Sequence, residues 1–174
     1  MNIAYTMSPG RGDTDLILAR LAGALEARGI RCRGTVQINT ERPDTHLCDM
    51  DVMVLPKGPV LRISQNLGAN ARGCRLDPSG LEASVGLVEE GLTPQADLLI
   101  INKFGKHEAE GRGFRDIIGK ALAMEVSVLV GLNAMNKPAF EDFAGDLAVQ
   151  VEPTQEALLA WVQSVTALSS PVAV

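Results

Sequence analysis

The stretch MSPGRGDTD, residues 7 to 15, carries the residue types of a loop that binds a phosphate group. It follows a short apolar run and leads into a helical pattern, and Gly10 and Gly12 let a ligand approach the backbone closely. The N-terminus of the helix that follows offers free N–H groups and the positive end of a dipole. Together with Ser8, these residues predict a site for an anion.

One residue of this loop has the wrong charge for a standard nucleotide site. A loop of the G-x-x-x-x-G-K-[ST] type has a lysine before the hydroxyl residue, whereas this chain has Asp13 before Thr14, and Met7 replaces the first glycine. Two like charges about 4 Å apart repel by roughly 4 kcal/mol at an effective dielectric constant near 20. An anion would therefore need Arg11, a lysine from another strand end, or Mg²⁺ held by Asp13 and Thr14. Alternatively, Asp13 and its neighbour Asp15 only complement the helix dipole.

Charged residues also follow the apolar run ADLLIIN, residues 96 to 102, in the sequence KFGKHEAEGR. Ligands of open α/β sheets bind beyond the carboxyl ends of the strands, so Asn102, Lys103 and Lys106 are expected near the first loop. A strand that holds Mg²⁺ would end in Asp, and an amide is a poorer ligand for this ion. Lys103 would supply the positive charge that the first loop lacks. The alternative is an ion pair between Lys103 and Asp13 that closes an empty site.

A third polar segment, RISQNLGANARGCRLDP, gathers arginines around two glycines. The planar guanidinium groups of Arg72 and Arg75 match the geometry of oxyanions. One interpretation is a lid that covers a bound anion, and the other is an ordinary solvated loop whose glycines make turns.

The expected secondary structure is that of an α/β three-layer sandwich, because apolar runs that indicate buried strands alternate with helical periodicity. A hairpin formed by DVMVLP and PVLRIS is expected around Lys57 and Gly58. Asp77 and Pro78 are typical of a helix start. The pattern predicts strands at 2–7, 30–38, 96–102, 126–132 and 147–151, and helices at 14–28, 78–90, 111–124, 138–143 and from 153 onward.

Composition limits the class of protein. The 174 residues fit one domain, taken as residues 1–168 with a loose tail at 169–174, and the low aromatic content of 3% predicts an aliphatic core. The net charge of −5 argues against a nucleic-acid-binding surface. The chain has no apolar run long enough to span a bilayer and no signal peptide, and its three cysteines show no framework spacing. We therefore expect a cytoplasmic protein. The sequence is compatible with a homodimer but does not require one.

The run ADLLIINKFGKHEAEGRGFRDIIGKAL resembles a motif of the thermophile-type nucleoside-triphosphatase family, whose members have a P-loop fold and a D-E-x-G-K-x-E stretch. Gly105, Lys106 and Glu108 match that stretch, whereas Asn102 and Lys103 depart from it. Most of the chain is also similar to a bacterial family of unknown function with a GRGDTD-type loop and the motifs RISQ-L-G--ARGCRLDP and NKFGK-EAEGRG. Members of that family are often encoded beside molybdate-transport genes. The resemblance implies a mostly parallel, P-loop NTPase-like sheet with an inserted antiparallel hairpin, and a link to molybdenum handling.

Three functions fit these observations. The first is a protein that binds a nucleotide or an oxyanion such as molybdate at degenerate P-loop motifs. The second is a Mg²⁺-dependent nucleoside triphosphatase in which Lys103 replaces the loop lysine and Glu108 orients the attacking water. The third is a scaffold or regulatory partner that binds no ligand. The residues expected to contact an anion are Ser8, Gly10, Arg11, Gly12, Asp13, Thr14, Arg72, Arg75, Asn102, Lys103 and Lys106.

Overall fold

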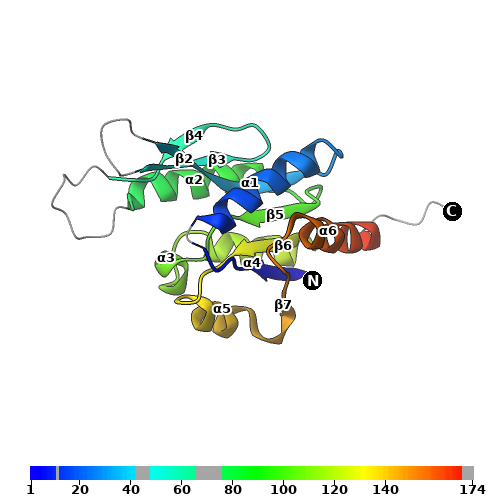
Figure 1. The fold of residues 1–174 in the computed structure, drawn as a ribbon. Helices are drawn as coiled ribbons and strands as arrows, with labels where there is room; N and C mark the ends of the chain where they lie inside the picture. Colours follow the sequence, from blue (N-terminus) through cyan, green and yellow to red (C-terminus); the bar gives the residue numbers. More distant parts are fainter. Residues whose placement is uncertain (11, 42–47, 66–75, 170–174) are drawn as a thin grey trace.

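The computed structural model describes residues 1–10, 12–41, 48–65 and 76–169. Within these residues the chain forms a single sheet with helices on both faces (Figure 1). The strands are β1 (Ile3–Thr6), β2 (Cys32–Glu41), β3 (Cys48–Val54), β4 (Val60–Arg62), β5 (Leu98–Ile101), β6 (Ser127–Gly131) and β7 (Ala148–Gln150). The helices are α1 (Asp13–Glu26), α2 (Pro78–Gly91), α3 (Lys106–Ala109), α4 (Arg115–Ala123), α5 (Lys137–Ala144) and α6 (Gln155–Ser169), with a short 3₁₀ turn, η1, at Gly145–Leu147.

The strand order is β4-β3-β2-β5-β6-β1-β7. The five strands from β2 to β7 in this order run parallel, and β3 and β4 add an antiparallel extension at the β2 side. This arrangement confirms the predicted mostly parallel α/β sheet with an antiparallel hairpin. Strand β6 lies between β1 and β5 and is parallel to both. The loops that follow these three strands therefore leave the sheet at the same carboxyl edge.

The two faces of the sheet have different cores. Helices α1 and α6 cover one face, where the buried residues are aliphatic apart from Cys32. Helices α2, α4 and α5 cover the other, where Phe104 stacks with Phe143 and meets Phe140 edge-on, and Tyr5 also contacts Phe140. The prediction of an aliphatic core therefore holds for one face only. Four of the aromatic residues, Tyr5, Phe104, Phe140 and Phe143, are in contact at α5, while the partly buried Trp161 packs on the other face.

The helix predicted at residues 111–124 is shorter than expected. It begins at Arg115, and a separate turn of helix, α3, precedes it. Gly111 and Gly113 have φ angles of 84° and 58°, and this left-handed conformation interrupts the helical backbone between the two elements. The sequence pattern alone did not indicate this break, because the apolar residues on either side keep helical spacing.

Strand β2 is longer than predicted, since it continues to Glu41 and pairs with β3 along its whole outer half. The C-terminal helix begins at Gln155, close to the expected start, and buries Leu158, Val162 and Val165. Residues 170–174 of the predicted tail lie outside the described residues. No helix within the described ranges is long and apolar enough to cross a membrane.

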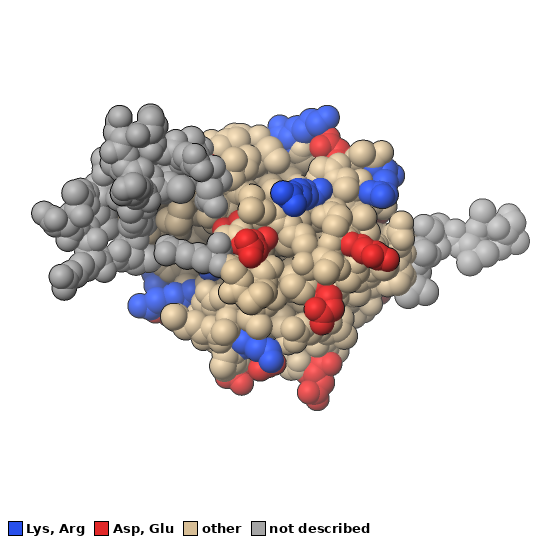
Figure 2. Space-filling model, in the orientation of Figure 1, with Lys and Arg blue, Asp and Glu red and all other residues tan. Residues whose placement is uncertain are grey.

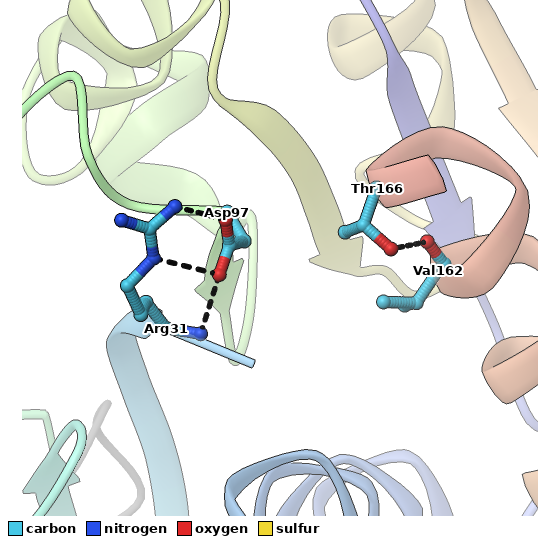
Figure 3. Close-up of polar contacts among 4 residues, drawn as sticks. All are labelled: Arg31, Asp97, Val162 and Thr166. Carbon is cyan, nitrogen blue, oxygen red and sulfur yellow. Dashed lines mark hydrogen bonds and ion pairs between the residues drawn. The ribbon is translucent and has the colours of Figure 1, made fainter. Parts of the chain in front are cut away.

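The amino ends of β2 and β5 are joined by a charged pair (Figure 3). Arg31 donates from Nε and Nη2 to the two carboxylate oxygens of Asp97, at 3.0 and 2.6 Å, and its backbone N–H also donates to Asp97 at 2.8 Å. Hydrogen bonds from Arg31 hold the pKa of the Asp97 carboxyl below its usual value. Figure 3 also shows a hydrogen bond within α6, where the Thr166 hydroxyl donates to the carbonyl of Val162.

Candidate functional site

The glycine loop between β1 and α1 has the backbone of an anion site. Gly12 adopts a left-handed conformation, with φ of 84°, and α1 begins at the next residue. The backbone N–H of Ser8 donates to the Thr14 hydroxyl at 3.0 Å, which closes the loop. Among the described residues, the backbone N–H groups of Gly12 and Thr14 have no hydrogen-bond partner. These two donors are therefore free to bind an anion at the positive end of the helix dipole.

The carboxylate of Asp13 folds back over the same loop. A side-chain carbon at Gly10 would overlap with the Asp13 carboxylate, so the glycine is what allows this position. Asp13 is exposed, and it forms no ion pair with any described residue. A negative charge thus lies at the mouth of the loop, where a ligand phosphate would approach.

Thr6 is a polar residue that the sequence analysis did not select. It is the last residue of β1, it is completely buried, and its hydroxyl has no hydrogen-bond partner among the described residues. Ala4, two residues earlier, packs in the core on the α1 side, and alternation along the strand places Thr6 on that same side. An unpaired buried hydroxyl is costly, so its position directly before the glycine loop is informative. The polar end of the apolar run IAYT was the sequence signal.

Asn102 lies at the carboxyl end of β5 and is 4% exposed. Its side-chain oxygen, Oδ1, accepts the backbone N–H of Gln37 in β2 at 2.9 Å. Its side-chain nitrogen, Nδ2, donates to the carboxylate of Asp15 in α1 at 2.9 Å. The amide nitrogen is also 3.5 Å from the side-chain oxygen of Gln37. Asn102 therefore joins two strands to the first turn of α1. We call this set, Asp15, Asn102 and Gln37, the amide latch.

Gly131 of β6 lies between Asn102 and Thr6 in the sheet. It is paired with Thr6 in the register of β1 and β6, and a side-chain carbon at Gly131 would overlap with the carbonyl oxygen of Asn102 and press on Leu18 of α1. The glycine thus lets α1 lie close to the carboxyl ends of three strands. This proximity explains how the side chain of Asp15 reaches Asn102.

The two lysines of the second predicted cluster differ in their contacts. Lys103 is exposed and makes no ion pair with any described residue, so the pair between Lys103 and Asp13 that the sequence allowed is not formed. The ammonium group of Lys106 is 3.6 Å from Glu110 on the adjacent turn, and Arg112 also pairs with Glu110. Lys103 is therefore the lysine of this segment whose charge is not already offset.

Glu108 is buried, with 3% of its surface exposed. One carboxylate oxygen accepts the backbone N–H of Gly105 at 2.9 Å and the other accepts that of Phe114 at 3.1 Å. A side-chain carbon at Gly113 would overlap with the same carboxylate. The side chain predicted to orient a water molecule is thus engaged in folding the segment between β5 and α4.

Three of the predicted anion contacts, Arg11, Arg72 and Arg75, lie outside the described residues. Among the described residues on either side of 66–75, Ser64 and Leu76 form a β-bridge and the N–H of Asp77 donates to the carbonyl of Ile63 at 2.8 Å. Strand β4 runs parallel to β2, since both are antiparallel to β3. Residues 63–65, which follow β4, therefore lie at the carboxyl edge of the sheet, the same edge as the glycine loop.

The described part of the face drawn in Figure 2 shows no strong preference for one sign of charge. Figure 2 shows basic and acidic side chains interspersed over the described part of one face. A groove of about 420 Å³ between α2 and α4 is likewise mixed, with Glu82, Glu89 and Asp116 beside His107 and Lys120. No residue of the glycine loop lines this groove. Within the described residues, no group of three His, Cys, Asp or Glu side chains is placed to hold a metal ion.

The class of fold is that of the P-loop nucleoside triphosphatases. The structure resembles THEP1 from the hyperthermophile Aquifex aeolicus with a TM-score of 0.63, 20% sequence identity, and coverage of 98% of this chain and 100% of that one. It also resembles a human cancer-related nucleoside triphosphatase with a TM-score of 0.60, 16% identity, and 99% coverage of both chains. These likenesses concern the fold, and they confirm the class expected from the sequence.

The chain belongs to the family described as "Protein of unknown function (DUF2478)", whose model matches residues 3–161. A relative is the molybdenum import ATP-binding protein ModC 2 of Bradyrhizobium diazoefficiens, which is 33% identical over 159 residues. The match covers 91% of this chain but 18% of that protein, so the chain spans less than one fifth of the relative's length.

Proposed function

We propose that this chain binds a small anion, either the phosphates of a nucleotide or an oxyanion such as molybdate, at the glycine loop. The observation that carries this proposal is the pair of unbonded N–H groups of Gly12 and Thr14 at the start of α1. The unpaired Thr6 hydroxyl is buried at the end of the strand that leads into the loop, so it lies beneath the loop and is not exposed to a ligand. Free backbone donors at a helix start are the usual construction of a phosphate site.

The charge of the ligand is balanced by Lys103 in this proposal. Asp13 repels an anion at the mouth of the loop, and the exposed ammonium of Lys103 provides the opposing attraction from two residues beyond β5, which β6 separates from β1. Lys103 thereby takes the place of the lysine that Asp13 replaces in the loop. Arg11, Arg72 and Arg75 remain predictions from the sequence.

Binding is favoured over hydrolysis by the position of Glu108. A water-orienting carboxylate must be accessible to the attacking water, whereas both oxygens of Glu108 accept backbone N–H groups inside the protein. A triphosphatase that used Glu108 would first have to break two buried hydrogen bonds. We therefore place the nucleoside triphosphatase second and the scaffold that binds no ligand third.

We infer a link to molybdenum from the name of the relative. The matched protein is named as an ATP-binding protein of molybdenum import, and the similarity extends over nearly all of this chain. We propose that the chain acts beside a molybdate importer as a module that responds to nucleotide or to molybdate. Its acidic balance and mixed surface suit a small-molecule ligand better than nucleic acid.

The test is a thermal-shift comparison with ATP, GTP and molybdate, each against sodium chloride of equal ionic strength. A ligand at about 100 times its dissociation constant stabilises the folded state by about 2.7 kcal/mol, which raises Tm by several degrees. Lys103→Ala should weaken the binding, while Lys57→Ala, which removes an exposed lysine in the hairpin turn, should not.

Each outcome separates the three functions. A shift with molybdate alone would favour an oxyanion sensor or carrier, and a shift with ATP or GTP would call for a phosphate-release assay with Glu108→Gln as its control. Equal affinity of the wild type and Lys103→Ala would show that Lys103 does not meet the ligand. The absence of any shift would leave the scaffold as the better account.

A further inference from the structure

The end of β5 is the place where a P-loop protein would be expected to hold a magnesium ion, and its residues do not fit that ion. Magnesium takes oxygen ligands, above all carboxylates. At this strand end the side chain is the amide of Asn102, whose one oxygen already accepts the N–H of Gln37 at 2.9 Å. The orientation of the amide follows from that bond, because a backbone N–H must face the oxygen and not the nitrogen.

The amide nitrogen of Asn102 consequently faces Asp15, at 2.9 Å from a carboxylate oxygen. The position that would offer a negative ligand therefore presents two N–H donors, and the nearest carboxylate of α1 is held by one of them. The hydroxyl of Thr14 accepts the N–H of Ser8, which occupies one of the two lone pairs of its oxygen. Among the described residues of the loop, Asp13 is the carboxylate that faces solvent.

We propose that the amide latch replaces a cation site, so that the glycine loop binds its anion without a divalent cation. This inference rests on the proposed anion-binding function. The latch fixes the first turn of α1 against β5 and β2, which keeps the N–H groups of Gly12 and Thr14 in a constant position relative to Lys103. The positive charge that a magnesium ion would supply comes instead from the lysine next to Asn102 in the sequence.

The polarity of the latch can be tested without any anion. Asn102→Asp places a second carboxylate against Asp15, and like charges in a buried position repel. We expect the Tm of this variant to fall and millimolar Mg²⁺ to restore part of the loss. The Tm of the wild type should be the same with Mg²⁺ as in buffer free of divalent cations. The double variant Asp15→Asn with Asn102→Asp exchanges donor and acceptor, and it should recover stability without Mg²⁺.

Two results would overturn the latch. One is an Asn102→Asp protein as stable as the wild type and indifferent to Mg²⁺. The other is a double variant that does not recover stability, and this measurement also decides the matter if Asn102→Asp alone cannot be purified. If the side chain of Asn102 only filled space, the double variant would not be expected to recover the Tm.

The metal-free binding is tested by titration calorimetry with ATP, and with molybdate as a second probe, in buffer containing EDTA or Mg²⁺. We expect dissociation constants for the wild type that agree within a factor of about two between the two buffers, well below the tenfold change that 1.4 kcal/mol would produce. Asp13→Asn should tighten binding in EDTA, because it removes the repulsion at the mouth of the loop.

Binding that appears only with Mg²⁺ and is lost in Asp13→Asn would show that Asp13 holds the cation, and the inference would be wrong. Failure of every anion to bind in either buffer would count against the proposed function and the metal-free binding together. The latch would still be decided by the thermal-shift result, so the two failures are distinguishable.

Discussion

The adjacent strands β2 and β5 are joined by side chains at both ends, but by opposite means. At the amino ends, Arg31 and Asp97 form a charged pair whose side chains are 57% and 21% exposed. At the carboxyl ends, the neutral amide of Asn102 is 4% exposed and makes its bonds inside the protein. The first arrangement is solvated and the second is enclosed by α1 and the sheet.

This difference indicates how the two edges of the sheet respond to substitution. An exposed ion pair contributes little, because water and salt screen it and because each side chain keeps good solvation when its partner is lost. A buried amide cannot turn to water instead. When its partner is removed, the folded state is destabilised by the full desolvation cost of the unpaired group. The amino edge is therefore tolerant of change, while the carboxyl edge, where we place the ligand, depends on the identity of single atoms.

The largest effect is expected from Glu108→Ala at the carboxyl edge. It removes the acceptors of the N–H groups of Gly105 and Phe114, and each buried group left unpaired costs about 1–3 kcal/mol. We expect the free energy of unfolding in urea to fall by about 2–4 kcal/mol by this reasoning. Glu110→Ala, at an exposed residue two positions away, is the matched control, and an equal loss for both variants would contradict the structural role of Glu108.

A smaller loss is expected from Asn102→Ala. The Gln37 N–H loses its acceptor and Asp15 loses a donor, so the free energy of unfolding should decrease by about 1–3 kcal/mol. Hydrogen exchange would locate the change, with faster exchange at the outer half of β2 and the first turn of α1. A uniform change across the protein, with no local increase at these amides, would contradict the latch.

Asp97→Asn at the amino edge should cost less, about 0.5–1 kcal/mol, because the pair is largely solvated. The loss should shrink further as salt is added, since exposed charges are screened within about 10 Å at 0.1 M ionic strength. Denaturation at low and high salt measures both effects. A loss as large as that of Asn102→Ala would remove the distinction between the two edges.

The smallest effect is a dependence on pH that Asp97 should confer. Its pKa is lowered in the folded state by the hydrogen bonds from Arg31, so its stabilising contribution is present above the unfolded value of about 3.9. That contribution disappears as the pH falls through the folded pKa. The difference in unfolding free energy between the wild type and Asp97→Asn should be constant from neutral pH to about pH 5 and should vanish in acid. A difference that grows on acidification would contradict this assignment.

The order of the elements could be predicted from the sequence because it depends on local pattern. A few adjacent residues are enough to predict each of these elements. Examples are the apolar runs at β1, β5 and β6 and the helix start at Asp77 and Pro78. The break between α3 and α4 was missed because the positive φ of Gly113 accommodates the carboxylate of Glu108, a contact that the apolar spacing does not report.

The candidate site was only partly predictable, for a related reason. Residue types indicated the glycine loop and the cluster after β5 as candidate binding residues, which remain predictions, but they did not show which donors and acceptors are already paired. Asn102 was interpreted as a weakened metal ligand until its partners Gln37 and Asp15, which are 65 and 87 residues away in the chain, were known. Sheet register decides such pairings, and it is not encoded in the spacing of any one segment.

The bare backbone at Gly131 has a consequence for how the site keeps its dimensions. Helix α1 rests against β6 at a point where no side chain intervenes, since a carbon added there would overlap with Asn102 and press on Leu18. One methyl group at this position would collide first with the backbone oxygen of Asn102 and would then displace the tip of the Leu18 side chain. The close approach of the carboxyl ends of β5 and β6, beside the strand end that carries Lys103, thus requires a residue without a side chain at position 131.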